Sequence, residues 1–137
     1  MSAAPVIRIV AALIADERGH VLLVRKRGTD AFMQPGGKYE PGENAREALV
    51  RELSEELGIT ASTSDLDYLG YFEADAANEA GHVVEAEVFR LALTGAMTPT
   101  GGLVPLAEID ELIWHDIANP GDVIVAPLSV DRIFPLL

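Results

Sequence analysis

Three observations predict an α/β protein in which helices cover a mixed β-sheet. Segments rich in β-branched and aliphatic residues outnumber the helical segments. One long Gly- and Pro-rich loop leads into a well-delimited helix in the middle of the chain. The other strand-like segments are joined by short polar turns, which favour hairpins over the helical crossovers of a parallel sheet. We therefore expect a mixed-sheet α/β sandwich and not a doubly wound parallel sheet.

The strand-like segments fall into two predicted hairpins and one late strand. Val6–Ala15 and Val21–Arg27 flank the turn sequence Asp16–Gly19, and we expect them to pair as a hairpin. Two further strands flank a polar loop at Asn78–Gly81. These two and the late strand are Asp67–Glu73, His82–Leu93 and Glu111–His115.

The central helix has recognisable signals at both ends. Asn44 and Glu47 have the spacing of a capping box, and Gly58 is typical of a residue that ends a helix. These signals predict a helix over Ala45–Leu57. A second helix is expected near the end of the chain, over Leu128–Phe134.

Length and composition predict a single domain, residues 1–137. Hydrophobic residues make up 49% of the chain and charged residues 23%, which excludes an intrinsically disordered protein. Cysteine is absent, so disulfides, thiolate metal sites and cysteine nucleophiles are excluded. Its absence fits a reducing compartment, and we expect a cytoplasmic protein.

The net charge of −12 bears on the partners of the protein. A negative field repels polyanions, so we expect no binding to duplex nucleic acid. A small phosphorylated ligand is still compatible, because divalent cations can bring phosphate to carboxylates. The apolar segment that starts at Val6 is too short to cross a membrane and contains Arg8, so we expect no membrane span.

Three glutamates mark one side of the predicted central helix. Glu52, Glu55 and Glu56 fall on an arc about 100° wide at 100° per residue. A solvated acidic face is the ordinary interpretation, but Ala45 and Ala48 lie on the same arc and leave space above the carboxylates. Oxygen donors in such a cluster suit Mg²⁺ or Mn²⁺ and not zinc. A separate apolar stripe suited to docking on a sheet consists of Leu49, Val50, Leu53 and Leu57.

The spacing around this helix identifies a family resemblance. Gly37 is followed after five residues by Glu43, and after seven more by the sequence Arg-Glu-Leu-Ser-Glu-Glu-Leu-Gly-Ile at residues 51–59. This pattern matches every specified position of the Nudix box, so the chain resembles a Nudix hydrolase. In length and in the sequence Pro-Gly-Gly-Lys at residues 35–38, it resembles the MutT-like nucleoside triphosphate pyrophosphohydrolases. The order of elements resembles the α/β/α sandwich of that family.

The resemblance implies a reaction and a set of residues for it. Nudix hydrolases cleave a diphosphate linkage in a nucleoside diphosphate derivative and use divalent metal, here expected to be Mg²⁺, with Mn²⁺ as a substitute. Carried over by position, the metal ligands are Gly36 through its carbonyl, Glu52, Glu55 and Glu56. The catalytic group is expected to comprise the same three glutamates and Arg51, which also resembles the partner of Glu43 in the structural ion pair of the family.

Hydrolysis also needs a group that accepts the proton of the attacking water. In the family this base varies between a glutamate of the box and a glutamate on a later loop. Glu56 is the first candidate here. Glu108 and Glu111, which precede Trp114, are the alternatives, with solvated loop acids as the ordinary interpretation of both.

Candidate substrate-binding residues lie before and within the loop. Arg25 and Arg27 point to the same face of their strand and are interpreted as a phosphate clamp, with an ordinary charged strand end as the alternative. Lys38 is placed to reach phosphate. Phe32 and Tyr39 flank the loop and are candidates for stacking on a nucleobase, although core packing explains Phe32 equally well.

The sequence leaves the substrate open. The first hypothesis is a (d)NTP pyrophosphohydrolase that releases nucleoside monophosphate and pyrophosphate. The alternatives are a hydrolase of ADP-ribose or a nucleotide sugar, and a binding module without catalysis. The asparagine that reads oxidised guanine in MutT has no counterpart, because Ala-Pro-Leu occupies its place at residues 126–128. The oligomeric state is not readable from the sequence, and a homodimer remains open.

Overall fold

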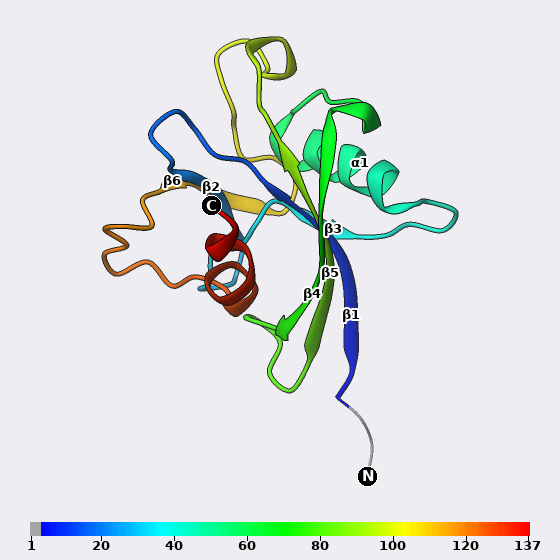
Figure 1. The fold of residues 1–137 in the computed structure, drawn as a ribbon, viewed down its shortest axis with the longest axis vertical. Helices are drawn as coiled ribbons and strands as arrows, with labels where there is room; N and C mark the ends of the chain where they lie inside the picture. Colours follow the sequence, from blue (N-terminus) through cyan, green and yellow to red (C-terminus); the bar gives the residue numbers. More distant parts are fainter. Residues whose placement is uncertain (1–3) are drawn as a thin grey trace.

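The computed structural model describes residues 4–137 and contains six strands and one regular α-helix (Figure 1). The strands are β1 (Val6–Leu13), β2 (Val21–Lys26), β3 (Gly36–Lys38), β4 (Leu66–Asp75), β5 (Val83–Leu91) and β6 (Ile109–His115). The helices are α1 (Ala45–Leu57), the short 3₁₀ turns η1 (Thr63–Asp65) and η2 (Gly95–Met97), and the terminal η3 (Leu128–Ile133) and η4 (Phe134–Leu136).

The main sheet is mixed, as the sequence predicts. Its strand order is β3-β1-β5-β4. β1 runs parallel to β5, whereas the β1–β3 and β4–β5 pairs are antiparallel. The predicted hairpin around Asn78–Gly81 is therefore confirmed as the β4–β5 pair. A second, two-stranded sheet consists of β2 and β6.

The other predicted hairpin, between Val6–Ala15 and Val21–Arg27, is wrong. β1 and β2 belong to different sheets and meet at their turn, where Ala15 bridges to Val21. The physical reason lies in β1, whose residues from Val10 to Leu13 are all buried. A strand buried on both faces is an interior strand: β5 pairs along the whole of one edge, and β3 pairs with Ile9–Ala11 on the other. Only the end of the chain segment beyond β3 is left for β2, where the Leu22 N–H donates to the Ile14 carbonyl at 2.9 Å.

The central helix has the predicted bounds because both of its caps form. The Asn44 side chain accepts the Glu47 backbone N–H at 2.9 Å, and the Glu47 carboxylate accepts the Asn44 N–H at 3.0 Å. Gly58 adopts the left-handed conformation at φ 70° and donates its N–H to the Ser54 carbonyl. The local sequence alone therefore determines where α1 begins and ends.

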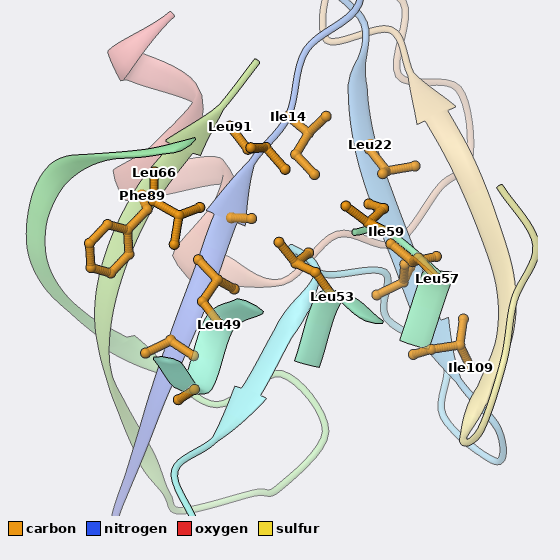
Figure 2. Packing of buried hydrophobic residues seen from close by; sticks show 14 residues of the cluster. Ile14, Leu22, Leu49, Leu53, Leu57, Ile59, Leu66, Phe89, Leu91 and Ile109 are labelled. Atoms are coloured by element: carbon orange, nitrogen blue, oxygen red, sulfur yellow. The ribbon is translucent and has the colours of Figure 1, made fainter. Parts of the chain in front are cut away.

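Two cores lie on opposite faces of the main sheet. Leu49, Leu53 and Leu57 of α1 are fully buried, as the predicted stripe requires. They pack with residues of β1, β2 and β5, among them Leu22, and with Ile14 just after β1 (Figure 2). The second core contains Leu128 and Ile133 of η3 with the other face of β1 and β5, so helices cover both faces of the sheet.

The terminal helix is less regular than predicted for Leu128–Phe134. It forms a π-helical segment, η3, and then a 3₁₀ turn, η4. Pro135 lies in this turn, and a proline cannot donate the backbone hydrogen bond that would continue a helix. Of the helices formed by residues 4–137, none has the length and apolar character needed to cross a membrane.

Candidate active site beside the central helix

A pocket of about 330 Å³ lies between α1, the short strand β3, the end of β2 and the loop before β6. The three glutamates predicted as metal ligands all line it. The complete lining is Lys26, Gly37, Lys38, Glu52, Glu55, Glu56, Ala107 and Glu108. We call this cavity the carboxylate pocket.

Two glycines allow this segment to lie close to both α1 and β1. A Cβ atom at Gly37 would lie 2.6 Å from the carboxyl carbon of Glu52. One at Gly36, whose φ is 149°, would lie 2.0 Å from the carbonyl oxygen of Val10. The Gly36 N–H instead donates to the Glu56 carboxylate at 3.1 Å. The double glycine therefore lets backbone polar groups and carboxylates share one small space.

Glu56 has an unusual environment for a carboxylate. Only 6% of the residue is exposed. This burial is the main cause that raises its pKa to about 8, and the negative charge of Glu52 adds to the effect. The hydrogen bond from Gly36 and the positive charge of Lys26 act in the opposite direction. Such a group is stabilised in its charged form by any cation that enters the pocket.

Arg51 connects the loop to the helix. Its guanidinium donates two hydrogen bonds to Glu43, at 2.7 and 2.9 Å, which forms the expected ion pair. It also donates to Glu52 at 2.9 Å and to Glu55 at 3.2 Å, as well as to the Lys38 carbonyl. These bonds raise the pKa of Arg51 and lower that of Glu43. Arg51 thus orients two of the three pocket carboxylates.

The donor set fits a hard divalent cation. It consists of carboxylates and nearby backbone groups, with neither cysteine nor histidine in the lining. Within residues 4–137, no three acidic or histidine side chains already converge as ligands. Arg51 explains part of this, because its guanidinium holds Glu52 and Glu55. The lining thus groups oxygen donors of the kind that hard cations bind around the buried Glu56 carboxyl.

The family model for the NUDIX domain matches residues 5–129, which is more than half of the chain. The chain belongs to the NUDIX family.

Relatives agree with this assignment over different lengths. The CTP pyrophosphohydrolase of Escherichia coli (strain K12) is 30% identical over 135 residues, covering 96% of this chain and 88% of the relative. The 8-oxo-dGTP diphosphatase of Haemophilus influenzae is 38% identical over 65 residues, 44% and 48% of the two chains. The solution structure of the E. coli ORF135 protein aligns with a TM-score of 0.64 at 28% identity, covering 94% of each chain. Alignments to six other curated relatives span only 29% to 65% of their length.

Lys26 is a pocket residue of this Nudix domain that the sequence analysis did not select. It is the last residue of β2 and lines the carboxylate pocket. It alternates with Leu22 and Val24, which belong to the core beneath α1. The signal was therefore present in the sequence, because the strand face that docks α1 also points its last side chain toward the glutamates of α1.

Arg25 points to the other side of β2 and is already held there. Its guanidinium donates to Glu111, to Asp110 at 2.7 Å and to the Thr29 carbonyl at 2.9 Å. It also lies 5.9 Å from the centre of the Phe32 ring. Neither Arg25 nor Phe32 is among the residues that line the carboxylate pocket. A role for either in substrate binding stays a prediction, and this geometry does not favour it.

The remaining candidates separate in the same way. Lys38 lines the pocket, whereas Arg27 follows β2, is exposed, and donates its backbone N–H to Glu108. Of the two alternative bases, Glu108 lines the pocket. Glu111 pairs with Arg25 on the opposite side of the β2–β6 sheet.

The loop that carries Glu108 is hydrogen-bonded to α1 and turns sharply after that contact. The Leu106 N–H donates to the carbonyl of Glu56, close to the end of α1, at 2.9 Å. Ala107 then adopts φ 52°, a left-handed conformation that costs a non-glycine residue about 1–2 kcal/mol. This strained residue turns the chain so that Glu108 lies beside the glutamates of the Nudix helix.

Proposed function

We propose that this chain is a Mg²⁺-dependent pyrophosphohydrolase that hydrolyses a nucleoside triphosphate to nucleoside monophosphate and pyrophosphate. The observation that carries the proposal is the carboxylate pocket, in which the buried Glu56 lies beside Glu52, Glu55 and Lys26. The family and the relative named CTP pyrophosphohydrolase, which aligns over 96% of this chain, support the reaction class.

The metal would be held by Glu52, Glu55, Glu56 and the Gly36 carbonyl. When bound, it supplies charge neutralisation of the diphosphate oxygens and a lower pKa for the attacking water. The chain itself must hold the substrate and move the proton. Lys26 and Lys38 line the pocket, and their ammonium groups bind the outer phosphate oxygens in this proposal.

Glu56 accepts the proton of the attacking water in this proposal. A base works best when its pKa lies near the working pH, and burial has already raised the pKa of Glu56 to about 8 in the metal-free chain. A bound cation lowers that value and keeps the carboxylate ionised. Glu108 is the second candidate, because it lines the same pocket. Arg51 positions Glu52 and Glu55 through its hydrogen bonds.

A substrate panel with Mg²⁺ tests the proposal. It contains the common NTPs and dNTPs, 8-oxo-dGTP, ADP-ribose and a nucleotide sugar, with release of pyrophosphate and monophosphate measured. We expect turnover of a nucleoside triphosphate with pyrophosphate as product, and no turnover in excess chelator. Turnover of ADP-ribose or the nucleotide sugar, without turnover of any nucleoside triphosphate, would contradict the proposed substrate class. Full activity in chelator would overturn the metal requirement.

A further inference from the structure

A second and larger cavity, of about 760 Å³, lies on the α1 side of the main sheet. Figure 1 shows β1 and the β4–β5 pair extending below α1 and the loop that precedes it. The cavity lies along this uncovered part of the sheet. Its side-chain walls include Tyr39 from the loop, Tyr71 from β4, and Glu85 and Glu87 from β5. We call it the tyrosine pocket, and its volume is in the range of small-molecule sites.

The strand register places these side chains on one face. Glu87 pairs with Tyr71 across β4–β5 and with Val10 across β1–β5. Val10 belongs to the core beneath α1, so Glu87 and Tyr71 project from the same face as that core. The floor of the tyrosine pocket is therefore a polar continuation of the surface on which the Nudix helix packs.

The two carboxylates of the floor differ in their partners. Glu85 is ion-paired to Arg8, with 3.4 Å between Nε and Oε1. Glu87 makes no ion pair within residues 4–137. A hydrogen bond to its carboxylate is the main cause that raises the pKa of the Tyr68 hydroxyl, and its charge adds to the burial that raises the pKa of the Tyr39 hydroxyl. An ionised carboxylate only accepts hydrogen bonds. The pocket thus offers an acceptor between aromatic rings.

The tyrosine pocket and the carboxylate pocket share one residue. Lys38 lines both cavities, and Tyr39 follows it directly in the chain. A ligand whose phosphates lie at Lys38 in the carboxylate pocket therefore has its remaining portion within reach of the tyrosine pocket. An aromatic, uncharged portion suits this place, because the acidic floor repels phosphate.

We propose that the tyrosine pocket holds the nucleobase and selects bases that carry an exocyclic amino group, through the Glu87 carboxylate. The inference rests on the proposed function for the phosphate end of the substrate. An amino group such as cytosine N4 donates to a carboxylate. Uracil presents a carbonyl at the same position, which cannot donate and leaves the carboxylate unpaired. The tyrosine rings stack on the base without discriminating between the two.

The pair CTP and UTP tests this selection, because the two differ at that position. For the wild type we expect kcat/KM for CTP to exceed that for UTP at least tenfold. Glu87→Gln supplies a group that donates and accepts, so the ratio should fall below threefold. Glu17→Gln removes a carboxylate from the exposed turn after β1 and should keep the wild-type ratio. An unchanged ratio in Glu87→Gln, or a wild type that does not discriminate, overturns the inference.

The aromatic wall is tested separately. Tyr71 is 47% exposed, so its replacement should leave the fold intact. Tyr71→Ala should raise KM for CTP and UTP by a similar factor, at least threefold, and Tyr71→Phe should restore it. An unchanged KM in Tyr71→Ala would show that the nucleobase does not stack on Tyr71.

Binding without turnover separates this inference from the proposed function. CMP is titrated into the wild-type protein, and chemical shifts of the Tyr39 and Tyr71 rings are followed by NMR, with UMP as the comparison. We expect CMP to shift both rings at lower concentration than UMP. Hydrolysis of triphosphates without any CMP shift would leave the function standing and overturn the base site. A CMP-induced shift in a protein that hydrolyses no triphosphate would support the base site and overturn the proposed function.

Discussion

Burial of Glu56 beside Glu52 creates an electrostatic conflict that a bound cation relieves. In the metal-free folded chain the pKa of Glu56 is raised from 4.5 to about 8, mainly by burial. Between these two values the folded state binds more protons than the unfolded state. The free energy of unfolding contributed by this group is therefore complete below about pH 4.5, and it decreases as the pH rises toward 8.

We therefore predict that the metal-free protein loses stability between pH 5 and 8.5, and that Glu56→Gln removes much of this loss. The measurement is the midpoint of denaturant unfolding at pH 5 and at pH 8.5, in the presence of chelator, for the wild type and each variant. Glu55→Gln is the matched control, because the Glu55 side chain is 53% exposed on the same helix. An equal pH dependence in wild type and Glu56→Gln would contradict the account of this residue.

Lys26 and Arg25 are neighbours in sequence with different expected roles. We predict that Lys26→Ala raises KM at least tenfold, because it removes a cation from the carboxylate pocket.

Arg25 is held by Asp110 and Glu111, so we predict that Glu111→Gln and Arg25→Ala both lower the thermal midpoint. If Arg25 were instead a phosphate clamp, Arg25→Ala would raise KM and Glu111→Gln would not. Thermal midpoints and KM values for the three variants decide between the two roles.

At the scale of elements, the sequence predicted those parts that local signals determine. The bounds of α1 followed from Asn44, Glu47 and Gly58, each of which acts within one helical turn. The β1–β2 hairpin was wrong because strand partners depend on distant segments. β3 was expected as loop, since Gly36 and Gly37 have low strand propensity and only the edge of β1 makes them a strand. The same holds for the site. The box glutamates lie within one short segment and were predicted, whereas Lys26 reaches the site from β2 and was not.

The close packing of β3 against α1 makes a prediction for this pair of elements. Gly37→Ala places a methyl group 2.6 Å from the Glu52 carboxyl carbon, so the carboxylate must move. We expect kcat to fall at least a hundredfold with the fold retained. Gly42→Ala is the control, because its added Cβ meets no atom within 4 Å, although its φ of 84° costs some stability. A Gly37→Ala enzyme with normal kcat would show that the position of Glu52 is not critical.

At the scale of the whole molecule, the sheet separates two tasks. η3 and the core on one face contribute stability, and the other face carries α1 and both pockets. With a net charge of −12, the chain repels a free nucleotide, so binding depends on cations at the carboxylate pocket. Its mixed-sheet architecture followed from the pattern of strands and loops, whereas the two pockets arise from strand register, which the sequence does not display.

The central claim is that the acidic side of α1 is a catalytic site and not a solvated face. It is tested most directly by kcat of Glu56→Gln with saturating Mg²⁺, on the best substrate of the panel, alongside the metal-free thermal midpoint at pH 8. We predict that kcat falls by orders of magnitude while the midpoint is equal to or above that of the wild type, since a buried charge has been removed. A kcat within about threefold of the wild type, a difference below about 0.7 kcal/mol, would contradict it.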